Sequence, residues 1–223
     1  MTRRKYKYND YNKSAPIADA TKYFIIYEGK SKEPNYFEAF NKAFIDPNKA
    51  FVCHVLEEDT GVEGNTPLKL KERAQAFINK PPSNIQVTPA FDDKFRFVLD
   101  VDKHNPKHLN ELNDFCKSLN NGKTFVSNFC FEVWLWAHVD DIAKITASKS
   151  SELKTEFGEI QDLHYPHDFM NIDIINKAIY TCKKSDDDET NFFPKEKNSK
   201  VYQLIEELIS HSHLNIEVEI EKT

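Results

Sequence analysis

The sequence predicts an α/β protein whose central sheet is parallel, doubly wound and flanked by helices. Short runs of β-branched and aromatic residues, typical of buried strands, alternate along the chain with longer segments that have helical spacing. Two of the strand-like runs, residues 23–27 and 95–99, are followed directly by acidic residues. The carboxyl ends of parallel strands carry the chemistry in open α/β sheets, so these acids are the first candidates for a functional site.

The first part of the chain supplies three predicted strands and two predicted helices. We expect strands at residues 22–27, 51–57 and 95–102, because these runs are apolar and rich in β-branched and aromatic side chains. A helix begins at Pro34, since proline suits the first helical turn. A Thr-Pro pair opens a second helix, over residues 66–79. The first helix carries an aromatic stripe that we interpret as core packing: Tyr36, Phe37, Phe40 and Phe44.

The remainder of the predicted sheet is followed by helices. A helix is expected over residues 106–119, where an Asn-Asn-Gly sequence ends it, and a short strand over 124–127. The apolar segment 130–136 has the composition of a mostly buried helix. Further on the pattern becomes helical and less regular, and we expect helices near residues 171–183 and 195–211.

The chain divides into three parts by composition. Residues 1–20 form a basic arm in which lysines and arginines alternate with tyrosines, residues 21–140 form the α/β core, and residues 141–223 form a mainly helical extension packed on that core. Interleaved basic and aromatic side chains suit nucleic-acid binding by the arm. A terminus that packs its tyrosines on the body of the protein is the plainer interpretation.

Two segments of the extension have patterns of their own. Residues 186–189 form an acidic run, which we interpret as a solvated loop. Residues 215–220 alternate apolar and acidic side chains and predict either an edge strand or a strand that pairs two copies in a homo-oligomer.

The composition narrows the class of protein. The chain has 30 basic and 36 acidic residues, so a nucleic-acid partner would have to meet a local basic patch. Its four cysteines form no Cys-x-x-Cys pair, which argues against a zinc or redox motif and favours free buried thiols. No apolar stretch follows the first residues, and no segment approaches the length needed to span a membrane. We therefore expect a cytoplasmic protein with no membrane contact.

The acids after the two strands predict a metal site. Asp100 and Asp102 are two positions apart, so in extended backbone they point to the same side. Together with Glu28 they would bring three negative charges to one sheet edge, and two unit charges about 4 Å apart repel by roughly 4 kcal/mol at an effective dielectric near 20. A divalent cation relieves this repulsion. Carboxylate oxygens suit Mg²⁺ or Mn²⁺, and we assign Glu28, Asp100 and Asp102 as its ligands.

These motifs are similar to those of known proteins. Glu28-Gly29 after one strand and Asp100-Val101-Asp102 after another resemble the two signature motifs of the Toprim domain, which topoisomerases, bacterial primases and several nucleases share. The resemblance implies a Toprim-like parallel sheet flanked by helices. It also implies that Glu28 serves as a general acid or base and that Asp100 and Asp102 bind magnesium.

A narrower resemblance is to the RloB-like family. The segments 27–37, 100–104 and 127–135 carry it, over about residues 20–140, while the helical remainder fits only loosely through residues 198–205. Proteins of this family are encoded beside an ATPase in restriction and phage-defence loci and are similar to abortive-infection effectors. The resemblance thus implies a metal-dependent nuclease, controlled by an ATPase partner, that acts on RNA or DNA.

Further residues match the narrower family's motif. Glu33, Asn128 and Glu132 lie at motif positions, and Glu132 is the best candidate for an additional catalytic ligand. If residues 128–132 are helical, Asn128 and Glu132 lie one turn apart and present both groups on one face. The alternative for Glu132 is an acid that stabilises the N-terminus of a helix through the macrodipole.

Basic residues surround the acids in sequence. Lys30, Lys32, Lys103 and His104, together with Asn128, are candidates for contacts with the substrate phosphate. The predicted reaction is hydrolysis of a phosphodiester, in which a metal ion activates water and neutralises charge. The competing hypothesis is a catalytically silent Toprim-like module that binds an ATPase or nucleic acid. Whether the substrate is RNA or DNA stays open.

Overall fold

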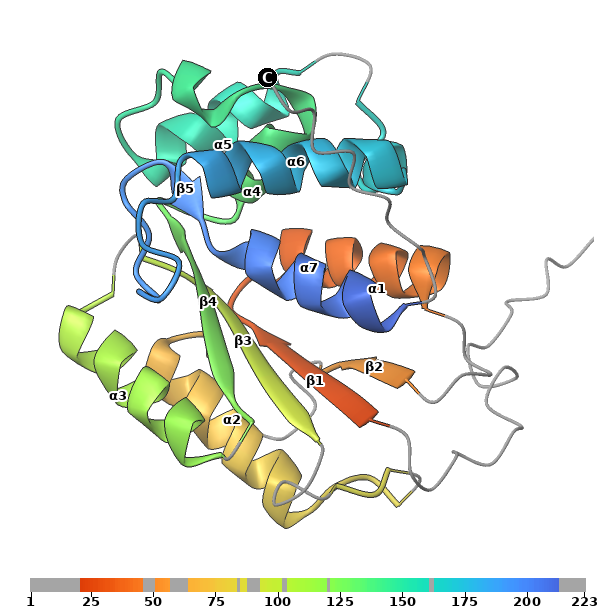
Figure 1. Cartoon of the computed structure of the whole chain (residues 1–223). Helices are drawn as coiled ribbons and strands as arrows, with labels where there is room; N and C mark the ends of the chain where they lie inside the picture. The colour runs from red at the N-terminus through yellow and green to blue at the C-terminus, as the bar shows by residue number, and fades with distance from the viewer. Residues whose placement is uncertain are drawn as a thin grey trace, which may run out of the picture.

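The molecule is built on one twisted sheet (Figure 1). The structure is a computed structural model and describes residues 21–45, 51–56, 64–83, 85–87, 93–101, 104–119, 121–160 and 163–212. Within these residues the sheet has five strands in the order β2-β1-β3-β4-β5. The strands are β1 (Thr21–Tyr27), β2 (Phe51–Val55), β3 (Lys94–Asp100), β4 (Lys123–Asn128) and β5 (Asn198–Ser199).

The first four strands are parallel, as predicted, and β5 alone is antiparallel. Helices connect the parallel strands because a crossover has to return the chain to the same end of the sheet. The helices are α1 (Lys32–Phe44), α2 (Pro67–Asn79), α3 (Pro106–Ser118), α4 (Glu132–Val139), α5 (Ser150–Gly158), α6 (Ile172–Lys184) and α7 (Val201–His211).

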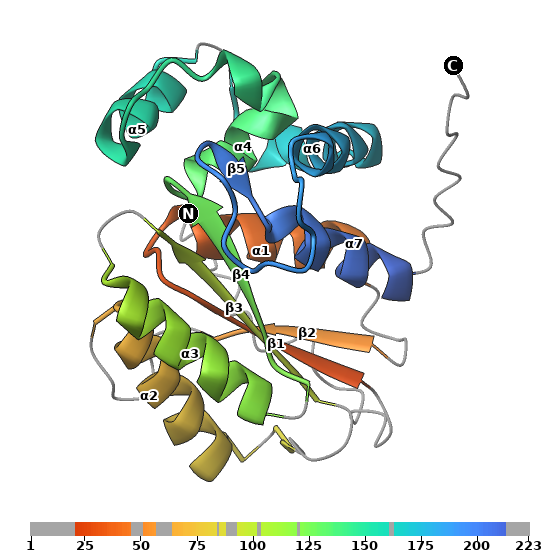
Figure 2. The ribbon, with the colours of Figure 1, turned by 60° about the vertical axis from the view of Figure 1, so that its left-hand side comes forward.

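Helices cover both faces of the sheet (Figures 1 and 2). Helices α2 and α3 lie on one face, α1 and α7 lie on the other, and α4, α5 and α6 gather beyond α1 and α7. Successive strand residues point to opposite faces. Along β1, Tyr23 and Ile25 join the core beneath α1 and α7, whereas Phe24 and Ile26 join the core beneath α2 and α3. Both faces are therefore apolar, which explains why the strands appear in the sequence as continuous hydrophobic runs.

The fold class and the elements of the core are confirmed, with ends that shift by a few residues. The C-terminal helices are also present, but the predicted helix over 195–211 begins only at Val201, because Asn198 and Ser199 pair with the end of β4. Helix α5 was not expected from the sequence. Because β5 extends the sheet and α7 covers its face, the C-terminal part of the chain takes part in the core.

One prediction for the extension is correct only in part. Residues 187–189 of the acidic run are exposed, as in a solvated loop, but the carboxylate of Asp186 is buried and pairs with the ammonium of Lys200 at 2.5 Å. The hydroxyl of Tyr202 also donates to Asp186, at 2.7 Å. The ion pair anchors this segment to the beginning of α7.

Some expectations fall on parts of the chain that the structure does not describe. The basic arm, residues 1–20, and the possible dimerisation strand, residues 215–220, lie outside the described residues. The four cysteines are free and buried, as expected. In the part of the chain that is described, no helix has the length and apolar character that crossing a bilayer requires.

Candidate functional site

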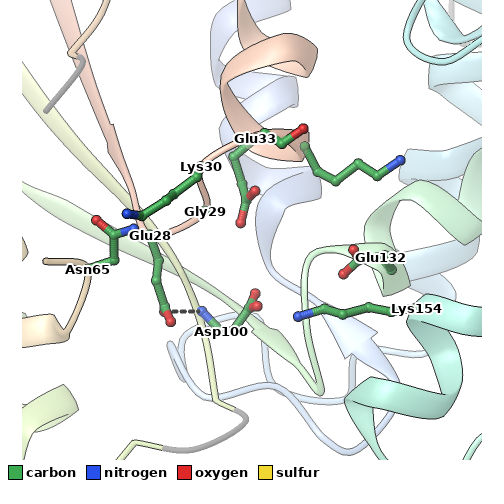
Figure 3. Close-up of a pocket in the computed structure, with 10 residues that line it drawn as sticks. Glu28, Gly29, Lys30, Glu33, Asn65, Asp100, Glu132 and Lys154 are labelled. Carbon is green, nitrogen blue, oxygen red and sulfur yellow. Dashed lines mark hydrogen bonds between the residues drawn. The ribbon is translucent and has the colours of Figure 1, made fainter.

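An acidic cavity lies where β1 and β3 end (Figure 3). Its volume is about 390 Å³. Strand β1 leads into Glu28, β3 ends at Asp100, α1 carries Glu33 in its first turn and α4 begins with Glu132. These four side chains line the cavity and point toward a common space, and we call them the acidic cluster.

Parallel pairing of β1 with β3 brings the first two acids together. Tyr27 lies opposite Val98 in the register, and the backbone N–H of Glu28 donates to the carbonyl of Val98 at 3.1 Å. The backbone N–H of Asp100 in turn donates to Oε2 of Glu28 at 3.2 Å. The two acids are 72 positions apart in sequence, so the sheet register alone makes them neighbours.

His104 holds the other carboxylate oxygen of Glu28. Its Nε2 lies 2.7 Å from Oε1 of Glu28, and both side chains are largely buried. Each oxygen of Glu28 therefore has a partner within the protein. His104, which the sequence suggested as a substrate contact, thus lies beside the acids and orients one of them.

Gly29 makes room for the third acid. A Cβ atom built on Gly29 would lie 1.8 Å from Oε2 of Glu33, closer than any real contact. Glu33 occupies this space from the first turn of α1 and is only 5% exposed. A side chain at position 29 would push the Glu33 carboxylate out of its present place.

Burial and mutual repulsion disfavour the ionised form of the acids in this cluster. Burial raises the pKa of Asp100 well above its usual value, and the charges of Glu33, Glu28 and Glu132 raise it further. Burial likewise raises the pKa of Glu33 to about 7, against the effect of a backbone hydrogen bond that lowers it, and the charges of Glu132 and Glu28 add to the rise. Desolvation and like charges both disfavour an ionised carboxylate, so a bound cation would stabilise this cluster.

Glu132 lines the cavity, whereas Asn128 does not. The prediction that both lie on one helical face is wrong, because Asn128 ends β4 and the helix begins only at Glu132. The side-chain amide of Asn128 donates to the carbonyl of Pro194 at 3.4 Å. Glu132 is buried in the first turn of α4, where it faces the cavity and also lies at a helix N-terminus, so its position is compatible with both interpretations given for it.

The lysines predicted to contact the substrate phosphate differ in their surroundings. Lys30 is exposed and extends toward Asn65 on the cavity wall (Figure 3). Lys32 has its ammonium on the ring faces of Tyr165 and Phe157, at 4.5 and 5.3 Å from the centroids. Asp102 and Lys103 lie outside the described residues.

The structure adds residues that the sequence did not single out. Lys154 of α5 lines the cavity beside Glu132 and across from Glu28 and Asp100, and no sequence motif signals it. Asn65 lies on the other wall, where the fully buried Arg73 donates to its Oδ1 at 2.9 Å. Arg73 also donates to the carbonyl of Tyr27 at 3.3 Å, so it ties this wall to the end of β1. Glu33 was marked by the family motif, but its proximity to the other acids required the fold.

The donor chemistry of the cavity suits a hard divalent cation, because its acids offer only oxygen ligands and repel one another. Among the residues that the structure describes, which do not include Asp102, no three His, Cys, Asp or Glu side chains lie close enough together to hold a metal ion. Glu28, Asp100 and Asp102 remain the predicted ligands. Of these, Glu28 and Asp100 are brought together.

Comparison with known proteins identifies a family. The family model described as RloB-like protein matches residues 23–208. This match confirms the predicted family and extends well past the core into the C-terminal helices. No curated protein and no solved structure matches the chain.

Proposed function

The chain belongs to the RloB-like family, and we propose that it is a metal-dependent nuclease that hydrolyses phosphodiester bonds in RNA or DNA. The observation that supports this proposal is the convergence of Glu28, Glu33, Asp100 and Glu132 on one cavity at the carboxyl ends of the parallel strands. Carboxylate oxygens in a shared cavity, where burial and like charges disfavour their ionised form, are suited to binding Mg²⁺ or Mn²⁺.

Each residue has a proposed role. Asp100 and Asp102 would hold the cation, as the Toprim resemblance implies, with Glu28 as the third predicted ligand and Glu132 as the candidate for a further one. When bound, the cation would polarise the phosphate and lower the pKa of a water molecule. Glu28, whose carboxylate is oriented by His104 and by the N–H of Asp100, would exchange the proton of the attacking water or the leaving oxygen.

We further propose the biological setting that the family resemblance implies. The nuclease would act in the cytoplasm as the effector of an anti-phage defence system, and an ATPase encoded in the same locus would restrain or trigger it. A homo-oligomer is compatible with this role.

A second candidate function is a catalytically silent module that uses the same face to bind an ATPase or nucleic acid. The observation that favours it is the absence, among the described side chains, of a group already arranged to hold a metal ion. The net charge of -6 makes nucleic acid the less favoured of its two partners.

The deciding experiment compares wild type with Asp100→Asn. Mixed RNA and DNA are incubated with each protein in Mg²⁺, in Mn²⁺ and in EDTA, with and without the neighbouring ATPase. We expect metal-dependent cleavage by wild type and a loss of about a thousandfold or more in Asp100→Asn, because the substitution removes a charged ligand. Asp114→Asn is the matched control, since Asp114 is exposed on α3, away from the cavity.

The possible results separate the two candidates. Cleavage that is lost in Asp100→Asn and kept in Asp114→Asn supports the nuclease. Equal cleavage by wild type and Asp100→Asn would place any activity elsewhere and contradict the site. Binding of nucleic acid or ATPase without cleavage under every condition would favour the silent module.

A further inference from the structure

Lys154 is a cationic side chain that lines the cavity on the side of Glu132 and faces Asp100 (Figure 3). It comes from α5, whereas Glu28 and Asp100 come from the ends of strands. Figure 3 shows its ammonium directed across the cavity toward Asp100. Its charge opposes the rise in pKa that burial and the neighbouring carboxylates cause at Asp100 and Glu33. Lys154 therefore interacts electrostatically with the cluster although the residue itself is exposed.

Helix α5 is held in this place by Lys32. The Lys32 ammonium lies over the ring of Phe157, which is three positions after Lys154 on α5, and over the ring of Tyr165. The hydroxyl of Tyr165 donates to the carbonyl of Lys32. Phe157 is buried in the core beside α4. These contacts attach α5 to the start of α1, which carries Glu33, and so fix the wall from which Lys154 extends.

The two lysines are thereby suited to different tasks. A lysine ammonium on two aromatic faces has its charge used within the protein. Lys154 is an exposed residue whose ammonium reaches toward the acids of the cavity, and its flexible four-carbon stem lets the ammonium move to an incoming anion. A phosphate drawn to a cation in the acidic cluster would bring its non-bridging oxygens toward Lys154.

We propose that Lys154 binds a non-bridging oxygen of the substrate phosphate. This inference rests on the proposed nuclease function for its account of catalysis. The phosphate contact itself concerns binding and can be measured without cleavage.

The test measures how binding of a labelled single-stranded oligonucleotide depends on salt. Wild type, Lys154→Met and Lys154→Arg are compared, with RNA and DNA, in Ca²⁺, which takes the same oxygen ligands as Mg²⁺ with looser geometry. Each phosphate contact to a single strand contributes about 0.7 to the slope of log K against log salt. We expect Lys154→Met to bind about fivefold more weakly at low salt and to lower the slope by about 0.7. Lys154→Arg should keep the slope.

Lys149→Met is the matched control. Lys149 caps the same helix, its side chain is 66% exposed, and it pairs with Glu152 rather than lining the cavity. Lys149→Met removes the same charge as Lys154→Met, so a general effect of net charge would lower the salt slope equally in both variants. A slope that is unchanged in Lys154→Met, or lowered equally in Lys149→Met, would overturn the assignment.

Cleavage assays in Mg²⁺ distinguish this inference from the proposed function. If wild type cleaves, Lys154→Met should lower kcat/KM about tenfold and Lys149→Met should leave it unchanged. If wild type binds with a Lys154-dependent slope but never cleaves, the nuclease proposal fails and the phosphate contact stands. If wild type neither binds nor cleaves either nucleic acid, both are contradicted.

Discussion

Buried charge is paired with opposite charge at the beginning of β3, whereas at its end buried acids lie beside one another. At the beginning of the strand, the guanidinium of Arg96 is 2% exposed and binds the carboxylate of Glu207 on α7 through Nε at 3.0 Å and through a second nitrogen at 2.5 Å. Lys94 and Lys123 lie 3.5 and 3.8 Å from the same carboxylate. At the end of the strand, Asp100 faces three other acids.

The pKa values follow this difference. Burial alone would raise the pKa of Glu207, but hydrogen bonds and charge from Arg96, with Lys123 and Lys94, hold it below its usual value. At Asp100 burial and like charges act in the same direction and raise the pKa. The paired end attaches α7 to the sheet, whereas the acidic end keeps an electrostatic cost that a bound cation would remove. Unfavourable charge of this kind is typical of functional sites.

The largest effect on stability is expected when the Arg96–Glu207 ion pair at the beginning of β3 is removed. Glu207→Gln leaves Arg96 buried without its carboxylate, and removing one partner of a buried ion pair costs about 3 kcal/mol. We expect that loss in the free energy of unfolding, measured with urea. Glu206→Gln on the same helix is the control, because its pair with Lys183 is exposed and should contribute less than about 1 kcal/mol. Equal losses in the two variants would contradict the contrast.

The second prediction shows what burial does to a group with neutral hydrogen-bond partners. His138 of α4 lies 2.9 Å from the carbonyl of Trp134 through Nδ1 and 3.1 Å from the hydroxyl of Tyr36 through Nε2, with Phe169 stacked on its ring. A carbonyl only accepts, so Nδ1 carries the proton and Nε2 accepts from Tyr36. Burial lowers the pKa of His138 from 6.5 to about 3, and the charge of Lys177 adds to this effect.

Because the unfolded chain binds this proton more readily, stability is lost as pH falls from about 6.5 toward 3. The loss at about pH 5 should be roughly 2 kcal/mol relative to neutral pH. We expect unfolding measured at both pH values to show a smaller acid loss in His138→Gln than in wild type. His164→Gln, at a side chain that is 81% exposed, should match wild type. An unchanged acid loss in His138→Gln would exclude this residue as its source.

The third prediction is a gain in the free energy of unfolding, whereas the first is a loss. Asp100→Asn replaces a carboxyl group whose ionised form is disfavoured by burial and by the charges of Glu33, Glu28 and Glu132, so it should stabilise the metal-free protein. At tenfold excess over its dissociation constant, Mg²⁺ should stabilise wild type by about 1.4 kcal/mol. The variant should lose this gain. Thermal unfolding with and without Mg²⁺ measures both effects, and a destabilised metal-free Asp100→Asn protein would contradict the repulsion inferred here.

The smallest expected effect on stability is at Gly29. Gly29→Ala forces the Glu33 carboxylate to move, because that carboxylate is the flexible end of a side chain, and we expect a change in stability below about 1 kcal/mol. Cleavage should nevertheless fall about tenfold, since the cluster is displaced. Gly158→Ala is the control, because nothing lies within 4 Å of its added methyl group. Cleavage that is unchanged in Gly29→Ala would show that the position of Glu33 does not matter.

The core of the fold was predictable because its signals are local. Apolar runs gave the parallel strands, and Pro67 and Pro106 each open a helix where the sequence placed one. Strand β5 gave no such signal, since Asn198 and Ser199 are polar and form a strand only by pairing with β4. The end of β4 was also misjudged, because that same pairing keeps Asn128 in the sheet.

The sequence by itself determined that acids follow β1 and β3, because hydrophobic runs and the carboxylates after them are adjacent along the chain. Tertiary structure alone decided which further groups share the cavity. It brought Glu33 and Glu132 to these acids, turned Lys32 onto aromatic rings and placed Lys154 beside Glu132. The physical reason is that parallel register and helix packing set distances between residues far apart in sequence, and no local pattern encodes those distances.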